Sequence, residues 1–295
     1  MGVFERLDQL YQKARVFEVA QDSRLAIFSD LHRGAGCGGD VFAKNEELYF
    51  AALGHYLREG YTYIELGDGD ELWKQSDFAK ITGEYSHIFE ALAKLYKEGR
   101  LILLYGNHDI IKSQKSWAKT QLDYFQPQAG GDEKPLFPGI DVHEAIRLRY
   151  LPQGGEMLLL HGHQANVFGG YFWRIEGFLV RYFWQPLEFL GLQNPFDAAQ
   201  NRKKRRKIEG RLEQWAKSRN RALIAGHTHR PVFPRKEAEG LYFNSGSGVH
   251  TRYVTGLEIV GGEIFPVKWE LSVREDGSLY VAKEAMGQPR RLQDL

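Results

Sequence analysis

Cysteine is almost absent from the 295-residue chain: Cys37 is the single one, which excludes an internal disulfide framework and is compatible with a reducing compartment. Neither sign of charge dominates either. With 39 Lys and Arg residues and 38 Asp and Glu residues, no global field attracts nucleic acid or an acidic substrate. The first residues, MGVFERLDQLYQKARVF, are charged throughout and lack the long apolar core of a secretory signal. These absences predict a cytoplasmic protein.

Short apolar runs alternate with longer helical patterns, and this alternation predicts an α/β fold. We expect strands at 25–29, 61–66, 101–105, 157–160 and 222–225, and helices at 45–58, 85–98 and 116–125. Toward the C-terminus, β-rich segments are separated by Gly-rich turns, which predicts antiparallel strands. Hydrophobic residues make up 43% of the sequence, enough for a large core, and no repeat interrupts it. We therefore expect one domain over residues 1–295.

Every expected strand in the first 225 residues ends in a polar cluster: SDLH, GDGDE, GNHD, HGH and GHTH, in that order. Ligands bind an open α/β fold beyond the carboxyl ends of its strands, so the five clusters can converge on one site. Their Asp, His and Asn side chains form a mixed oxygen and nitrogen set, which suits Mn²⁺, Fe or Zn²⁺. The candidate ligands, too many for one tetrahedral ion but sufficient for two ions that share a carboxylate, are Asp30, His32, Asp68, Asn107, His161, His227 and His229.

Each cluster alone has a simpler explanation. A histidine at a strand end is usually a hydrogen-bonded structural residue, and an Asp-rich stretch such as GDGDE often serves only as a turn. Five ligand-rich clusters that all follow apolar strands are hard to explain in that way. The sequence therefore favours a metal site.

Together and in this order, DLH, GDGDE, GNHD, HGH and GHTH resemble the signature of the calcineurin-like metallophosphoesterase superfamily. The resemblance implies a four-layer αββα sandwich of two mixed sheets, with a dinuclear metal centre at the strand ends. By motif, Asp68 would bridge the two metals. The other ligands would divide into two sets: Asp30, His32 and His229 for one metal, and Asn107, His161 and His227 for the second.

The resemblance also implies a metal-dependent phosphoric ester hydrolase. Two divalent ions, for which we favour Mn²⁺ over Fe or Zn²⁺, would clamp a phosphate and supply a metal-bound hydroxide that attacks phosphorus directly. His108 would face the scissile phosphate as a catalytic donor, with Asp109 behind it. Asn107 and His108 are expected at the substrate as well, and Arg33 could reach its phosphate through the planar fork of donors that Arg offers.

Three more polar residues lie beside the candidate ligands in sequence: Asp70, Glu71 and His163. Metal ligands usually depend on such neighbours for their orientation. We expect these three to orient ligands or hold the turns rather than to bind metal.

The segment between HGH and GHTH is too long for an ordinary connection, so we expect a helical insertion at about 164–220. Its first half is dense in aromatic residues, and its second half opens with the basic run RKKRRK. It could be a helical pair packed on the core or on a second subunit. Alternatively, it could be a cap whose apolar side chains accept a lipid while the basic run meets anionic headgroups, which would bring the protein peripherally to a membrane. Recurrent charges exclude a membrane span.

GHTHRP at 226–231, together with the insertion, resembles the UDP-2,3-diacylglucosamine pyrophosphohydrolases of lipid A synthesis. That family typically has Arg in place of His108 and Asp in place of His163, so the substrate class stays open. We expect hydrolysis of a phosphodiester or a pyrophosphate in a small phosphorylated substrate, which could be a nucleotide-linked lipid. A phosphomonoesterase or Ser/Thr protein phosphatase is the first alternative, and a non-catalytic binding module is the second. Nucleic acid is disfavoured as a partner, because a protein that binds it needs an exposed basic groove with stacking aromatic side chains.

Overall fold

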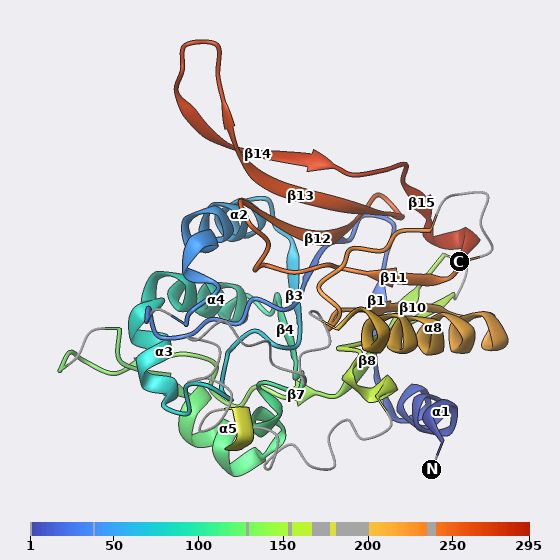
Figure 1. Ribbon diagram of the computed structural model, residues 1–295, viewed down its shortest axis with the longest axis horizontal. Coiled ribbons are helices and arrows are strands. Elements are labelled where there is room, and N and C mark those ends of the chain that lie inside the picture. The colour runs from blue at the N-terminus through green and yellow to red at the C-terminus, as the bar shows by residue number, and fades with distance from the viewer. Residues whose placement is uncertain are drawn as a thin grey trace.

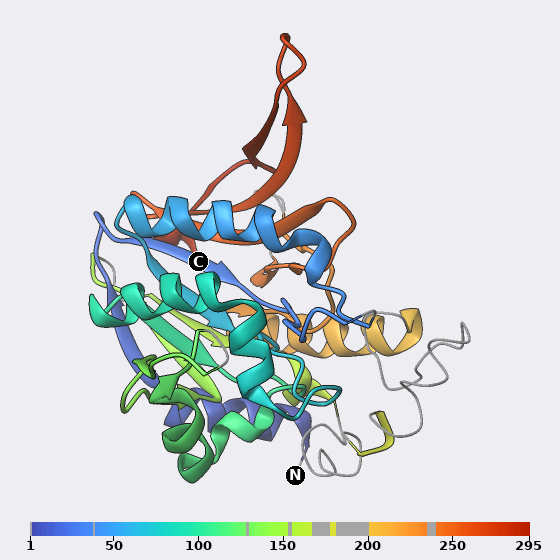
Figure 2. The same ribbon diagram turned by 90° about the vertical axis from the view of Figure 1, so that its left-hand side faces the viewer.

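Two β-sheets stack face to face with helices on both outer surfaces (Figures 1 and 2). The computed structural model describes residues 2–37, 39–127, 130–152, 155–166, 178–180, 201–234 and 240–295. Three clusters of buried apolar side chains correspond to the three interfaces between the four layers. The expected αββα sandwich of two mixed sheets is thus confirmed.

The larger sheet has eight strands, and three of its parallel strands lead into the first three motifs. Its parallel strands are β2 (Arg24–Phe28), β3 (Thr62–Leu66), β4 (Leu101–Leu104) and β7 (Val142–His143). Antiparallel strands extend the sheet on the other side of β2, in the order β12 (Tyr253–Val260), β13 (Glu263–Val273) and β14 (Leu279–Ala285), with β15 (Arg290–Arg291) beside β13. The C-terminal antiparallel strands expected from the Gly-rich turns are therefore present.

The second sheet has five strands, in the order β1-β8-β9-β10-β11. Their bounds are β1 (Arg15–Val19), β8 (Ala145–Tyr150), β9 (Glu156–Leu160), β10 (Ala222–Ala225) and β11 (Tyr242–Asn244). All neighbours are parallel except β8 and β9. A separate pair, β5 (Tyr124–Phe125) and β6 (Lys134–Pro135), follows the last helix of the first half and ends the expected helix 116–125 early.

Helices cover the two outer faces of the sandwich. On the eight-stranded sheet lie α2 (Glu46–Arg58) and α4 (Ser86–Lys97), with α3 (Phe78–Glu84) and α5 (Lys115–Leu122) beside them. On the five-stranded sheet lie α1 (Val3–Lys13) and α8 (Arg202–Arg219). The basic run forms the first turns of α8, whose buried side chains lie further along the helix at Ile208, Leu212 and Trp215.

The strands that lead to the motifs are apolar throughout because both of their faces are covered. Along β2, Ala26 and Phe28 join the core beneath α2 and α4, whereas Leu25 and Ile27 join the core between the sheets. A slip of one residue would exchange the two sets, so packing fixes the strand register. The positions of the strand ends, and of the polar residues after them, are fixed by the same packing.

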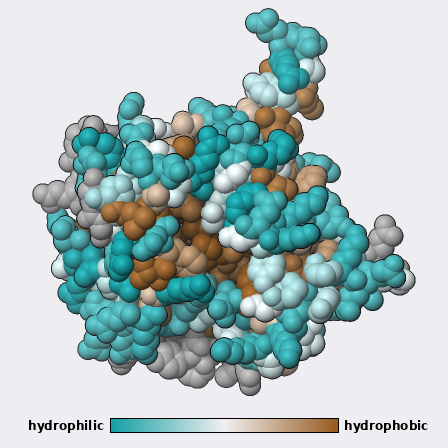
Figure 3. Space-filling model, turned by 180° about the vertical axis from the view of Figure 1, so that it is seen from behind, coloured by the Kyte–Doolittle hydropathy of each residue, from teal (hydrophilic) through white to brown (hydrophobic). Residues whose placement is uncertain are grey.

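Two further surface features are prominent. A cleft of about 630 Å³ opens at the starts of β2, β3 and β4, the end opposite the motifs, and Figure 3 shows apolar side chains gathered in a hollow on the rear face. The hairpin of β13 and β14 projects beyond the body of the fold (Figures 1 and 2), with Leu271, Val273 and Leu279 exposed. Among the described helices, none is both long enough and apolar enough to cross a bilayer.

Candidate metal centre

The candidate ligands come from loops that follow five strands of both sheets. Asp30 and His32 follow β2, Asp68 follows β3, and Asn107 follows β4, all in the eight-stranded sheet. The remaining ones, which follow β9 and β10 in the five-stranded sheet, are His161, His227 and His229. The site therefore spans the interface between the two sheets at one end of the sandwich.

An unusual backbone conformation recurs in these loops. Outside glycine, positive φ angles are uncommon, and each costs roughly 1–3 kcal/mol. Five of the seven candidate ligands nevertheless have φ in the left-handed region: Asp30 (53°), His32 (52°), Asp68 (50°), His227 (67°) and His229 (54°). Cross-loop hydrogen bonds hold them there, such as the bond from His32 N–H to the Asp68 carbonyl at 2.9 Å.

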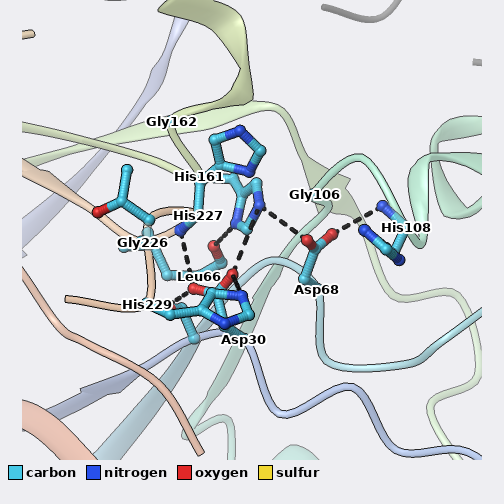
Figure 4. A network of polar contacts seen from close by, with 12 residues as sticks. Asp30, Leu66, Asp68, Gly106, His108, His161, Gly162, Gly226, His227 and His229 are labelled. Carbon is cyan, nitrogen blue, oxygen red and sulfur yellow. Dashed lines mark hydrogen bonds and ion pairs between the residues drawn. The ribbon is translucent and has the colours of Figure 1, made fainter. Parts of the chain in front are cut away.

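Two carboxylates lie at the centre of the cluster (Figure 4). Asp68 Oδ2 lies 3.1 Å from His161 Nε2 and 3.9 Å from His32 Nε2. Asp30 Oδ1 lies 3.1 Å from His229 Nε2, while its other oxygen accepts the His227 N–H at 2.8 Å. Side chains that are nearly 200 residues apart in the sequence thus converge within contact distance.

The ligand atoms fall into separable groups. Asp30, His32 and His229 place one ligand atom each within 4.8 Å of one another, and Asp68, His161 and His227 do the same. Two buried ligand atoms, Asn107 Oδ1 and His227 Nε2, make no hydrogen bond to the described residues. Buried polar atoms are normally paired, so such atoms beside carboxylates fit a cation site. The first group contains the three residues that the motifs imply for one metal, and the second joins His161 and His227 with Asp68, which also lies 3.9 Å from His32. A third group joins His32 with Glu71 and His108. The division of the ligands between two metals stays a prediction.

The close packing around Asp68 depends on a glycine in the next motif. A Cβ at Gly106 would lie 2.1 Å from Asp68 Oδ1 and 2.6 Å from the Asp68 nitrogen. Only glycine allows the GNHD loop to approach the GDGDE loop this closely.

The charges of the cluster are those of a cation site. Burial alone would raise the pKa of Asp30 and Asp68, but His229 beside Asp30 and His161 beside Asp68 hold both values well below their usual range. Burial would lower the pKa of His161, yet Asp68 and Asp30 raise it to about 9. Burial and the neighbouring His161 lower the pKa of His227 to about 3. Metal ligation requires neutral imidazoles, so a metal bound here would displace the proton of His161.

His108 is held beside this cluster by contacts on several sides. Its backbone N–H donates to Asp68 Oδ1 at 2.8 Å, and its Nδ1 lies 2.8 Å from Glu71 Oε1. The other oxygen of Glu71 lies 3.1 Å from His32 Nδ1. Trp73 stacks on the His108 ring, with centroids 4.2 Å apart and an interplanar angle of 28°. Glu71 thus orients the rings of His32 and His108 together, as expected of a residue next to the ligands.

Comparison with known families decides the assignment. A family model described as calcineurin-like phosphoesterase matches residues 23–231, well over half of the chain, from the start of β2 to the end of GHTHRP. The chain belongs to the calcineurin-like phosphoesterase family. The sequence-based recognition of this superfamily is thereby confirmed.

Solved structures add little to this family assignment. A search of curated proteins found no match. Vacuolar protein sorting 29 from Cryptosporidium parvum is similar over 90% of this chain and 98% of its own, with 16% identity and a TM-score of 0.39. Vps29 from Chaetomium thermophilum (11% identity, 89% and 96% coverage, TM-score 0.37) and a hypothetical protein from Thermus thermophilus (18%, 88% and 99%, 0.32) are similar at the same level. Scores this low carry no functional argument.

In this calcineurin-like phosphoesterase, Asp109 supports the loops from beneath. Its side chain is fully buried. One oxygen accepts the N–H groups of Gly106 at 2.7 Å and Asp68 at 3.2 Å, and the other accepts the Gly69 N–H at 3.2 Å. Asp109 was expected behind a catalytic His108; the contacts that the structure shows for it join the GDGDE and GNHD loops.

The expectation that Arg33 reaches the substrate phosphate is not supported by its position. Its side chain is only 1% exposed, with Nε 2.7 Å from Asp70 Oδ1 and Nη2 2.8 Å from Glu65 Oε1. The guanidinium lies over the ring of Phe89 in the core beneath α4. Because it is held by buried carboxylates, Arg33 stabilises the loop after β2 instead of facing the solvent.

Asp70 and His163 differ in how far they meet expectation. Asp70 holds its turn through Arg33 and Lys112, as expected of a residue next to the ligands. The His163 ring lies near the rings of His161 and His227, at centroid distances of 5.5 and 6.4 Å, but makes no hydrogen bond to the described residues. Burial and the neighbouring His161 lower its pKa, so it is held neutral.

Sequence reasoning did not identify Lys112, Trp73 or Asn45 as part of the site. Lys112 pairs with Asp109 three residues before it, a spacing visible in GNHDIIK. Trp73 follows Glu71 by two residues, and its stacking on His108 has no signal in the sequence alone. Asn45 donates to the carbonyls of Gly248 and His250, far away in sequence, at 2.8 and 2.6 Å. The basic second half of the expected helical insertion is present as α8, whereas the aromatic half lies largely outside the described residues.

Proposed function

We propose that this protein is a dinuclear-metal phosphoesterase that hydrolyses a phosphodiester or pyrophosphate bond by direct transfer of the phosphoryl group to water. The observation that carries the proposal is the convergence, at one end of the sandwich, of Asp and His side chains from both sheets beside His108, whose ring Glu71 orients. Two bound divalent ions would polarise the phosphate and supply a nucleophile at neutral pH.

The ligand roles follow the motifs, and the short distances from Asp68 to His161 and His32 support them. Asp68 contributes its carboxylate to both sets, and the others hold one ion each: Asp30, His32 and His229, and Asn107, His161 and His227. A mixed set of carboxylate, amide and imidazole ligands favours Mn²⁺, with Fe or Zn²⁺ as alternatives.

His108 is the group assigned to the leaving oxygen. Glu71 engages its Nδ1 at 2.8 Å and so fixes the orientation of the ring. The ring is partly accessible, with 18% of the side chain exposed, whereas Glu71 beside it is buried. In the reaction, the oxygen of water bonds to phosphorus, the ester bond breaks, and the departing oxygen accepts a proton or hydrogen bond from His108. Such assistance contributes on the order of 10² to 10⁴ in rate.

The substrate is proposed at the level of class. A nucleotide-linked lipid is one candidate, since GHTHRP and the insertion resemble lipid A pyrophosphohydrolases, and the basic run of α8 is largely exposed where anionic headgroups could meet it. That candidate includes peripheral membrane contact by a cytoplasmic protein. A phosphomonoesterase or Ser/Thr protein phosphatase is the alternative chemistry for the same site.

Metal analysis followed by parallel assays tests the proposal. Purified protein reconstituted with Mn²⁺ should hold about two ions per chain and turn over bis-p-nitrophenyl phosphate or a UDP-linked pyrophosphate faster than p-nitrophenyl phosphate. The reverse preference would support the phosphomonoesterase. Fewer than about one ion per chain with no turnover would overturn the enzyme assignment and favour a binding module. In ¹⁸O-labelled water, a single turnover should place one label in the released phosphoryl group, and an isolable phosphoenzyme would exclude direct transfer.

A further inference from the structure

Lys112 is a buried cation beneath the candidate metal centre. It lies in a short 3-10 helix, η2 (Ile110–Ser113), directly after the GNHD motif, and is 3% exposed. Its Nζ lies 2.8 Å from Asp109 Oδ2 and 2.6 Å from Asp70 Oδ2. A lysine is rarely buried unless it is paired, and here it joins carboxylates from two different motifs.

The first of these carboxylates, Asp109, leads directly to the site. It accepts the backbone N–H groups of Asp68, Gly69 and Gly106. Asp68 is the residue close to both ligand groups, and its φ of 50° requires support from its surroundings. Lys112 therefore acts on the conformation of Asp68 through one intermediate, Asp109.

The second carboxylate, Asp70, extends the network to the loop after β2. Asp70 also pairs with Arg33, which pairs with Glu65 at the end of β3. Arg33 and Asp70 are further joined by a backbone bridge. Three motif loops, SDLHR, GDGDE and GNHD, are thus connected by one buried set of charges.

The balance of charge makes Lys112 essential to this set. Among the described residues the network contains three buried carboxylates, Glu65, Asp70 and Asp109, and two buried cations, Arg33 and Lys112. Without Lys112, one guanidinium would face three buried carboxylates, and an unpaired buried charge is strongly unfavourable. Asp109 would then lose its cation while still holding three N–H groups, so the loop that carries Asp68 would loosen.

We propose that Lys112 is a positioning residue, which fixes the bridging carboxylate of Asp68 for metal binding through Asp109 and Asp70. The catalytic part of this inference rests on the proposed function, whereas the metal-binding part does not. Partners of metal ligands typically change affinity or activity by about 10- to 100-fold when they are replaced. An effect of that size is expected here, although Lys112 touches neither substrate nor metal.

Titration of metal-free protein with Mn²⁺, followed by calorimetry, tests the inference. Lys112→Gln, which keeps N–H donors but removes the charge, should bind Mn²⁺ about 10- to 100-fold more weakly than wild type. Lys112→Arg, which keeps the charge, should remain within about threefold of wild type on the same scale. The matched control is Lys115→Gln, at an exposed lysine three residues further on, and should not differ from wild type.

Activity provides an independent measurement. With bis-p-nitrophenyl phosphate, Lys112→Gln should lower kcat by about tenfold or more while KM changes less than about threefold. A lower melting temperature with unchanged Mn²⁺ affinity and kcat would overturn the inference, because it would show a purely structural role. If Lys112→Gln does not fold, the test rests on Lys112→Arg. A tenfold loss of Mn²⁺ affinity in folded Lys112→Arg would contradict the inference, and an unchanged Mn²⁺ affinity would support it. Wild-type protein that binds metal without turnover would count against the proposed function alone.

Discussion

Glu71 and His108 form a partly buried carboxylate–imidazole pair, with Glu71 Oε1 2.8 Å from His108 Nδ1, and the second oxygen of Glu71 lies 3.1 Å from His32 Nδ1. One carboxylate therefore fixes the ring orientation of a candidate metal ligand and of the histidine assigned to the leaving oxygen.

Replacement of Glu71 by Gln tests this shared control. Gln has one acceptor oxygen in place of two, so at least one ring loses its acceptor. We expect kcat to fall by about 10- to 100-fold. Glu275→Gln, in the exposed turn of the projecting hairpin, is the matched control and should behave as wild type. A Glu71→Gln variant with unchanged kcat and metal content would show that the contacts of Glu71 with His108 and His32 do not contribute to activity.

Asp68→Asn should abolish both metal loading and activity. The neutral amide removes the charge that lies 3.1 Å from His161 and 3.9 Å from His32. Metal content by mass spectrometry and hydrolysis of bis-p-nitrophenyl phosphate measure the two losses. Asp276→Asn, at an exposed position, should leave both unchanged. Full metal occupancy in Asp68→Asn would exclude a bridging role for this residue.

His108→Ala should retain its metal and lose rate, by on the order of 10² to 10⁴. The backbone N–H that contacts Asp68 remains in the alanine variant, so the metal cluster keeps that hydrogen bond. Substrates with better leaving groups should suffer less, because they need less help from a donor. Loss of one metal from this variant would instead make His108 a ligand.

Arg33→Met should destabilise the protein by about 3–5 kcal/mol, because it leaves Glu65 and Asp70 as buried carboxylates without this partner. Urea unfolding of the metal-free protein measures the change. If Arg33 contacted the phosphate, the variant would instead keep its stability and show a large rise in KM.

His250 provides a pH-dependent test of the fold near the site. Burial and the neighbouring His229 lower its pKa from 6.5 to about 4. Between these values the unfolded chain binds a proton that the folded protein does not, so this group reduces stability as pH falls from about 6.5 toward 4. In metal-free protein, the urea midpoint should fall less steeply over this interval in His250→Asn than in wild type. Parallel profiles would show that His250 does not contribute.

The positions of the motifs could be predicted from the sequence because each follows a strand buried on both faces, which leaves a long apolar run before a polar stop. The partners of the motif residues could not. Arg33 was expected at the substrate, since nothing local shows that Glu65 and Asp70 enclose it. The strands β1 and β8 were also not expected, because RVFEV has a charge on each face and AIRLRY has two arginines on one face, so neither is a long apolar run. The position of Arg33 and the formation of β1 and β8 depend on burial and on contacts between residues far apart in the sequence.

The distribution of the site over both sheets has a mechanical consequence. His161, His227 and His229 belong to one half of the sandwich, and Asp30, His32 and Asp68 to the other. Anything that binds all of them is a cross-link between halves whose shared core is built from apolar side chains. Occupancy of the site should therefore slow hydrogen exchange in the strands of both sheets. A chelator should accordingly speed amide exchange throughout the sandwich and not only in the five loops.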